Sequence, residues 1–151
     1  MNLTVVTTLE GSLDRTGRER AAAAVRGVYR EVLGERTLVL WRLVPTGSAF
    51  TANRPSEVAM AWITTSIRDG IEPARREAGL HALARAWAAS TGTTDDQVMI
   101  ALVDSSFFRR FLAATREQMS RPRGTAFMAR LLGRALSSYA RQRQLITTID
   151  F

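Results

Sequence analysis

The hydrophobic and polar positions change period several times along the chain, and each change marks an expected element. Residues 2–9 and 37–44 are rich in β-branched and apolar residues, which is typical of strands. Between them apolar residues recur at helical spacing, with Asp14 as the expected N-cap and Gly34 as the expected left-handed residue at the helix end. This part of the chain therefore predicts a strand–helix–strand unit.

The same order of elements recurs after an interruption. A Pro-Thr-Gly-Ser run breaks the pattern, so 45–57 is predicted to be a loop. A third strand is expected at about 58–67, followed by a helix that begins at Glu72 as N-cap and ends at Gly92. A fourth strand is predicted over 97–103.

The two units align without a gap when the chain is shifted by 58 residues, which superposes 2–34 on 60–92. In this alignment the helix N-cap Asp14 coincides with Glu72, the aromatic residue Tyr29 with Trp87, and the terminating Gly34 with Gly92. Two copies are too few for a solenoid, so we interpret the pattern as duplication within one domain spanning 1–151. The predicted fold is α/β: two tandem right-handed βαβ units form a four-stranded sheet with both helices on one face.

The expected repeats are 2–44 and 58–104, and a helical extension follows over 105–151. Within that extension Pro122-Arg123-Gly124 is expected to separate two helices. The runs 38–44 and 98–103 are almost wholly apolar, as strands buried on both faces should be. Because two helices cover one face only, a partner subunit is the simplest predicted cover for the other.

Composition narrows the chemistry. The chain has no cysteine and one histidine, which excludes thiolate chemistry and argues against a zinc site, so no metal ligand is assigned. It has no glycine-rich phosphate loop, and we expect no cofactor. No run approaches the roughly 20 apolar residues of a membrane span, and the N-terminus is unlike a secretory signal. We therefore expect a soluble, cytoplasmic protein without a membrane partner.

The positive charge is concentrated at the C-terminal end. All 21 basic residues are arginines, and 105–151 holds nine of them against Glu117 and Asp150. A nucleic-acid or anionic-membrane partner is one interpretation, because clustered cations release counterions from polyanions. An arginine-rich helical tail whose charges face water is the other, and we favour it, so nucleic acid is not an expected partner.

Several of these features together resemble the tautomerase superfamily. They are the duplicated βαβ unit, the Gly34 helix stop, a Pro45-x-Gly47 turn with Phe50, and Arg68 just after the third strand. Within that superfamily the chain looks most like the longer dehalogenase members that act on cis-3-chloroacrylic acid, over about residues 2–112. The resemblance implies a homotrimer, no cofactor, and an N-terminal proline that serves as the catalytic amine once the initiator methionine is removed.

This chain departs from that pattern at the catalytic amine, because the proline position falls on Asn2. An N-terminal amine has a pKa of about 7.7 and can carry protons near neutral pH, whereas an internal asparagine cannot. We expect Met1 to be retained before so large a residue. Its primary amine, displaced by one residue, is then the alternative proton carrier.

Other family positions carry over unevenly. The first of two substrate-carboxylate arginines matches Arg68, the helix histidine falls on Tyr29, and the strand phenylalanine falls on Trp41. Arg68 at the end of a strand can bind a carboxylate or enolate bidentately, although a salt bridge to Asp69 or Glu72 is an equal alternative. Tyr29 is suited to orienting or protonating a substrate, but a core position is favoured for it.

Trp41 and its neighbour Arg42 point to opposite faces of a strand, so only one of them can enter a given pocket. The candidate catalytic residues are therefore Met1, Asn2, Tyr29 and Arg68, and the candidate substrate-binding residues are Arg68, Trp41 and Arg42.

Three functions remain open. The first is an isomerase, hydratase or cyclase of altered mechanism acting on a small anionic or enolisable molecule, which Arg68 would polarise. The second is a non-catalytic small-molecule-binding or scaffold oligomer that kept the fold and lost the amine. The third, a basic nucleic-acid binder on a ferredoxin-like sheet, ranks last because paired exposed aromatic residues for base stacking are missing.

Overall fold

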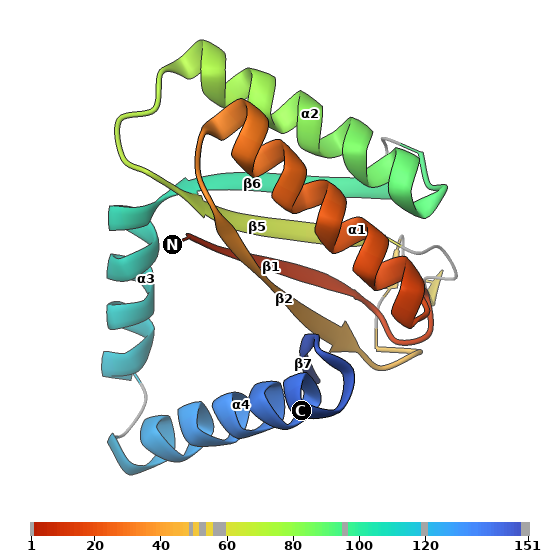
Figure 1. Ribbon diagram of the computed structural model, residues 1–151. Helices are drawn as coiled ribbons and strands as arrows, with labels where there is room; N and C mark the ends of the chain where they lie inside the picture. Colours follow the sequence, from red (N-terminus) through yellow and green to blue (C-terminus); the bar gives the residue numbers. More distant parts are fainter. Residues whose placement is uncertain are drawn as a thin grey trace.

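The computed structural model describes residues 2–48, 50–51, 54–55, 60–94, 97–118 and 121–148. The elements follow one another as β1 (Asn2–Leu9), α1 (Arg15–Val28), η1 (Tyr29–Leu33), β2 (Thr37–Val44), β3 (Phe50–Thr51), β4 (Arg54–Pro55), β5 (Ala61–Ile67), α2 (Pro73–Thr91), β6 (Val98–Asp104), α3 (Ser105–Gln118), α4 (Arg121–Gln142) and β7 (Leu145–Thr148). The predicted fold class is confirmed: two βαβ units build one sheet, with α1 and α2 side by side on one of its faces (Figure 1).

The order of strands in the sheet is β6-β5-β1-β2-β7. Within each unit the strands are parallel, β1 with β2 and β5 with β6, whereas β1 and β5 join the units in antiparallel pairing. The register sets Asn2 opposite Thr37 and Ile67 opposite Asp104. As a result, the starts of β1 and β2 meet the ends of β5 and β6 at one end of the sheet.

The first helix begins and ends where its sequence signals predict. The backbone N–H of Gly17 donates to Asp14 Oδ1 at 2.6 Å, which satisfies one of the free donors at the helix start. At the other end the helix widens into the π-helical turn η1, and Gly34 follows it with a φ of 69°. Gly92 ends α2 in the same left-handed conformation, with a φ of 73°. The helices of the two repeats therefore end in the same way.

The core lies between α1, α2 and the sheet. Its largest fully buried side chains include Trp41 and Trp87, whose ring centroids are 6.2 Å apart. Gly79 of α2 lies against Leu33, where a Cβ would be 2.8 Å from Leu33 Cδ2. A glycine here lets α2 approach the end of the first helix closely.

Several expectations are corrected in detail. Glu72 occupies the N-cap position of α2, but its side chain makes no capping hydrogen bond. Within the predicted loop 45–57, two-residue strands β3 and β4 pair with each other. Pro122 lies in the first turn of α4 and does not separate two helices, because a proline at that point removes no intrahelical hydrogen bond. Residues 119–120, between α3 and α4, lie outside the described residues.

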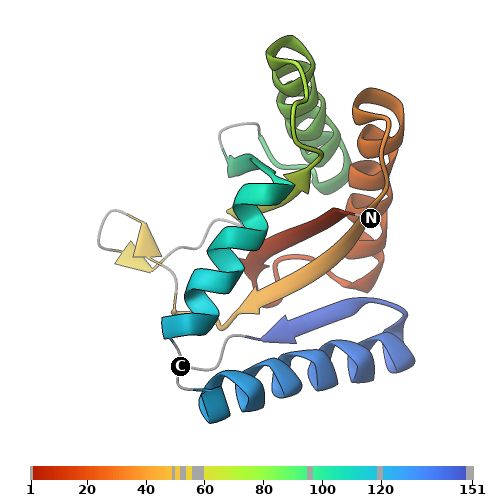
Figure 2. The same cartoon turned by 90° about the vertical axis from the view of Figure 1, so that its left-hand side faces the viewer.

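The C-terminal extension also adds a fifth strand that the sequence pattern did not predict. Strand β7 pairs in parallel with Leu40–Leu43 of β2, and α4 runs beside it (Figures 1 and 2). Ser138 holds the two together: its Oγ donates to Gln144 O at 2.8 Å and accepts from the N–H of Ile146 at 2.8 Å. The extension therefore belongs to the sheet and is not only a helical tail.

The face of the sheet opposite α1 and α2 is exposed in a single chain. Strand β2 alternates between buried and more exposed positions, and Leu38 and Arg42 point away from the helices. Trp62 of β5 and Met99 of β6 are exposed as well. The strands were predicted to be buried on both faces, but within a single chain only the face that packs against α1 and α2 is buried.

Candidate active site

A pocket of about 680 Å³ lies at the end of the sheet where β1 and β2 begin and β5 and β6 end. It is lined by Asn2, Glu35, Arg36, Arg68, Asp69, Ser105 and Arg109. These residues come from the start of β1, the turn before β2, the turn after β5, and α3. The sheet topology alone brings these segments together, since they are far apart in sequence.

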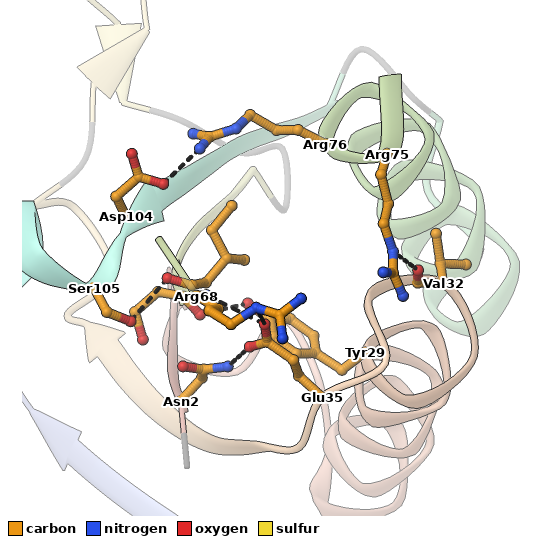
Figure 3. Close-up of polar contacts among 11 residues, drawn as sticks. Asn2, Tyr29, Val32, Glu35, Arg68, Arg75, Arg76, Asp104 and Ser105 are labelled. Carbon is orange, nitrogen blue, oxygen red and sulfur yellow. Dashed lines mark hydrogen bonds and ion pairs between the residues drawn. The ribbon is translucent and has the colours of Figure 1, made fainter. Parts of the chain in front are cut away.

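Glu35 is the polar centre of this pocket. Its carboxylate accepts a hydrogen bond from the Asn2 carboxamide through Oε2 and another, through Oε1, from the backbone N–H of Arg68 at 3.3 Å (Figure 3). The backbone N–H of Asn2 donates to Arg36 O at 3.1 Å. With 13% of its side chain exposed, Glu35 is largely buried, and it is held by groups from both βαβ units.

Arg68 extends from the end of β5 into solvent at the pocket. Its Nε lies 3.9 Å from Glu35 Oε1, and 70% of its side chain is exposed. Neither Asp69 nor Glu72, the two alternative partners considered from sequence, forms this ion pair. An exposed pair at such a distance holds a guanidinium weakly, so Arg68 retains most of its capacity to bind an anion.

Asp69 has a different partner. Its Oδ1 accepts from the backbone N–H of Ser106 at 2.9 Å, at the start of α3. This hydrogen bond to the backbone N–H of Ser106 is the main cause that lowers the pKa of Asp69, which favours the carboxylate form. The Ser105 hydroxyl donates to Ile67 O at 2.8 Å, so the turn between β6 and α3 is tied to the end of β5.

Tyr29 lies in the core next to this site and does not line the pocket. Its side chain is fully buried, and its hydroxyl donates to Ser66 O at 3.0 Å and forms a hydrogen bond with the Thr65 hydroxyl (Figure 3). Burial raises the pKa of Tyr29 to about 12. A neutral hydroxyl held in this way supports the position favoured from sequence, which is the core.

The Tyr29 hydroxyl belongs to a buried network of hydroxyl groups. Thr4 Oγ1 lies 2.5 Å from Thr65 Oγ1 and 2.8 Å from Thr37 Oγ1, so the network crosses β5, β1 and β2. Buried hydroxyls need such partners, because each unmade hydrogen bond would cost the full desolvation of the group. The network fixes the starts of β1 and β2 and thereby the position of Asn2.

The other predicted site residues lie elsewhere. Trp41 packs against Trp87 in the core, whereas Arg42, on the opposite face of β2, lines a separate pocket with α4. Met1 lies outside the described residues. Of the six candidates, the structure brings together Asn2 and Arg68.

Glu35, Arg36 and Arg109 line the pocket but were not among the residues selected from sequence. Glu35 and Arg36 directly precede β2, which begins beside β1, so the parallel pairing was the signal that could have indicated them. Arg109 has a weaker signal, because the direction of α3 has to be known before that residue can be placed.

Among the described residues, no group of three or more His, Cys, Asp or Glu side chains is arranged to hold a metal ion. No described helix is long and apolar enough to cross a membrane.

The duplicated βαβ sheet is the tautomerase class of fold. Solved structures with this fold match the chain. Native Ps01740 is 30% identical, with a TM-score of 0.63, and the match covers 70% of this chain and 96% of that one. A member of the cis-3-chloroacrylic acid dehalogenase family is 18% identical with a TM-score of 0.64, covering 68% of this chain and 73% of that one.

A third structure, a fused 4-OT wild-type symmetric trimer, is 19% identical with a TM-score of 0.60, covering 68% of this chain and 84% of that one. No family profile and no curated protein matches the chain. The chain belongs to the tautomerase superfamily.

Proposed function

We propose that this protein is an isomerase, hydratase or cyclase-type enzyme of altered mechanism that acts on a small anionic or enolisable molecule. The observation that carries the proposal is the pocket itself, which gathers Arg36, Arg68 and Arg109 around Asn2 and Glu35. Three guanidinium groups against the two carboxylates of Glu35 and Asp69 favour an anionic ligand. Of these two carboxylates, that of Asp69 already accepts a hydrogen bond from the backbone at the start of α3.

Arg68 is the proposed anchor for the ligand's carboxylate. Its planar guanidinium can bind two oxygens at once, and its pairing with Glu35 is weak enough to be replaced by a ligand. A carboxylate bound there would place the neighbouring carbon atoms in the pocket, close to the carboxylate of Glu35.

Glu35 is the proposed proton carrier, since the asparagine at the proline position cannot take this role. In an isomerisation the C–H bond next to a carbonyl breaks, its proton passes to a Glu35 oxygen, and its electron pair forms the enolate. The arginines stabilise the negative charge on the enolate oxygen, and the proton returns to a second carbon. Met1 stays the predicted alternative source of a basic amine.

A non-catalytic small-molecule-binding or scaffold oligomer is the second candidate function. One observation favours it: Asn2, at the position of the family's proline, has a carboxamide that is hydrogen-bonded to Glu35 and cannot carry protons as an amine would. This alternative predicts ligand binding without turnover.

We further propose that the protein is a homotrimer. The fused 4-OT structure is described as a symmetric trimer. In this chain the sheet face opposite α1 and α2 exposes Leu38, Trp62 and Met99, and apolar side chains gathered on one face are typical of an interface between subunits.

The test uses phenylenolpyruvate, whose conversion to the keto form is followed by ultraviolet absorbance, and phenylpyruvate, whose binding is followed by calorimetry. Replacing Arg68 by Ala should remove a charge-assisted bond of about 1.5 to 3 kcal/mol and weaken binding roughly 10- to 150-fold. Glu35→Gln should retain binding and lose turnover. Arg85→Ala, an exposed arginine of α2 outside the pocket, is the matched control and should change neither.

Two results would contradict the proposal in different ways. Unchanged affinity in Arg68→Ala would remove the anion site from this pocket. Tight binding without turnover in the unmodified protein would exclude the enzyme and leave the binding protein.

A further inference from the structure

A second pocket, of about 330 Å³, lies between α4, β7 and β2. It is lined by Arg42, Phe127, Arg130, Leu131, Arg134, Thr147 and Thr148. The pocket is built by the C-terminal extension, because the extension supplies all of these residues except Arg42.

All the charged side chains that line this pocket are positive. Arg42, Arg130 and Arg134 line it, and no carboxylate is present among its described lining residues. Within the described part of the chain, no acidic side chain forms an ion pair with Arg42 or Arg130. Arg42 and Arg130 therefore add positive charge to one cavity, and a bound anion would be attracted to both.

The walls of the pocket are held by hydrogen bonds. Arg134 Nη1 donates to Thr148 Oγ1 at 3.2 Å, and the Thr147 hydroxyl donates to Trp41 O at 3.3 Å. Ser138 ties α4 to β7 on the buried side of the helix. A cavity with walls fixed in this way needs little ordering when a ligand enters, which favours binding.

The pocket also has an apolar side. Phe127 and Leu131 lie one helical turn apart on α4 and border the cavity together with the methyl-bearing threonines of β7. A volume of about 330 Å³ is at the lower end of the range for small-molecule sites. The combination fits a small molecule with one strongly anionic end and one apolar end.

We propose that this pocket binds a small organic anion whose phosphate or paired carboxylate groups contact the three arginines and whose aryl or short alkyl group packs against Phe127 and Leu131. The site is separate from the one at Arg68. Arg42 lies six positions after Arg36, which precedes β2, and six steps of a strand correspond to roughly 20 Å.

The experiment measures binding of three probes by calorimetry: inorganic phosphate, phenyl phosphate and phthalate. Arg130→Gln should weaken phenyl phosphate and phthalate binding by about tenfold or more, as expected for loss of a charge-assisted bond. Arg141→Gln is the matched control on the same helix, because both side-chain hydrogen bonds of Arg141 to described residues go to Ser137 of its own helix and Arg141 does not line the pocket. It should leave affinity within about twofold.

Two further variants make the result specific. Phe127→Ala should weaken the binding of phenyl phosphate but leave the binding of inorganic phosphate unchanged. In the unmodified protein, tighter binding of phenyl phosphate indicates a phosphate ligand, and tighter binding of phthalate indicates a pair of carboxylates. Arg68→Ala should leave unchanged the binding event that Arg130→Gln weakens, which separates this site from the proposed active site. Equal affinities in Arg130→Gln and Arg141→Gln, or loss of the Arg130-dependent binding in Arg68→Ala, would overturn the assignment.

Discussion

The buried Tyr29 hydroxyl makes the stability of this protein sensitive to alkaline pH. Its pKa lies at about 12 in the folded chain, against 10.0 for an exposed tyrosine, because burial disfavours the charged phenolate. A raised pKa stabilises the folded state fully below pH 10, and that contribution falls as the pH rises towards 12. The full shift of two units is worth about 2.7 kcal/mol, of which about 1.4 kcal/mol is lost at pH 11.

Two measurements test this. Urea unfolding at pH 9 and pH 11 should show the free energy of unfolding about 1.4 kcal/mol lower at the higher pH. Tyr29→Phe should be less stable at pH 9, because Ser66 O loses its donor, but should lack this part of the pH dependence.

The chain has two tyrosines, and the exposed Tyr139 supplies the control. In Tyr139→Phe, absorbance at 295 nm reports Tyr29 alone, and circular dichroism shows over which pH range the chain remains folded. A tyrosinate transition near pH 10 in the folded protein would refute the reasoning, because it would mean that solvent reaches the hydroxyl.

Two further predictions concern packing and assembly. Gly79→Ala should lower the free energy of unfolding by about 1 kcal/mol, because steric strain of about 1 to 3 kcal/mol against Leu33 exceeds the gain in helix propensity. Gly27→Ala is the control and should not lower it, because an added Cβ there would have nothing within 4 Å. Thermal melts of the two variants are compared. Light scattering should give three times the mass of one chain, and Trp62→Arg on the exposed sheet face should reduce that mass; a stable monomer at micromolar concentration would disprove the trimer.

Local signals in the sequence were sufficient for the two repeats. The bounds of β1 and β2 match the predicted 2–9 and 37–44, because both runs are rich in β-branched and apolar residues. The helix ends at Gly34 and Gly92 were predictable for a similar reason: a left-handed residue after a helix favours glycine sterically. Such signals lie within one turn or one strand and need no knowledge of the fold.

The site could not be predicted in the same way, because its contacts join distant residues. Glu35 is 33 residues from each of its partners Asn2 and Arg68, and an acidic residue after a helix carries no sign of either contact. The family resemblance indicated Asn2 and Arg68 but not the carboxylate between them. Strand β7 was missed because four residues after a long helix are too few for a period to appear.

Strand β7 has a consequence for how this protein tolerates truncation. It is the only described strand on the outer side of β2, and it covers Leu40–Leu43. Loss of β7 would turn β2, a largely apolar strand of eight residues, into an open edge. Exposed edges of this kind pair with other chains, so β7 protects β2 against unwanted edge-to-edge pairing as well as forming a pocket wall.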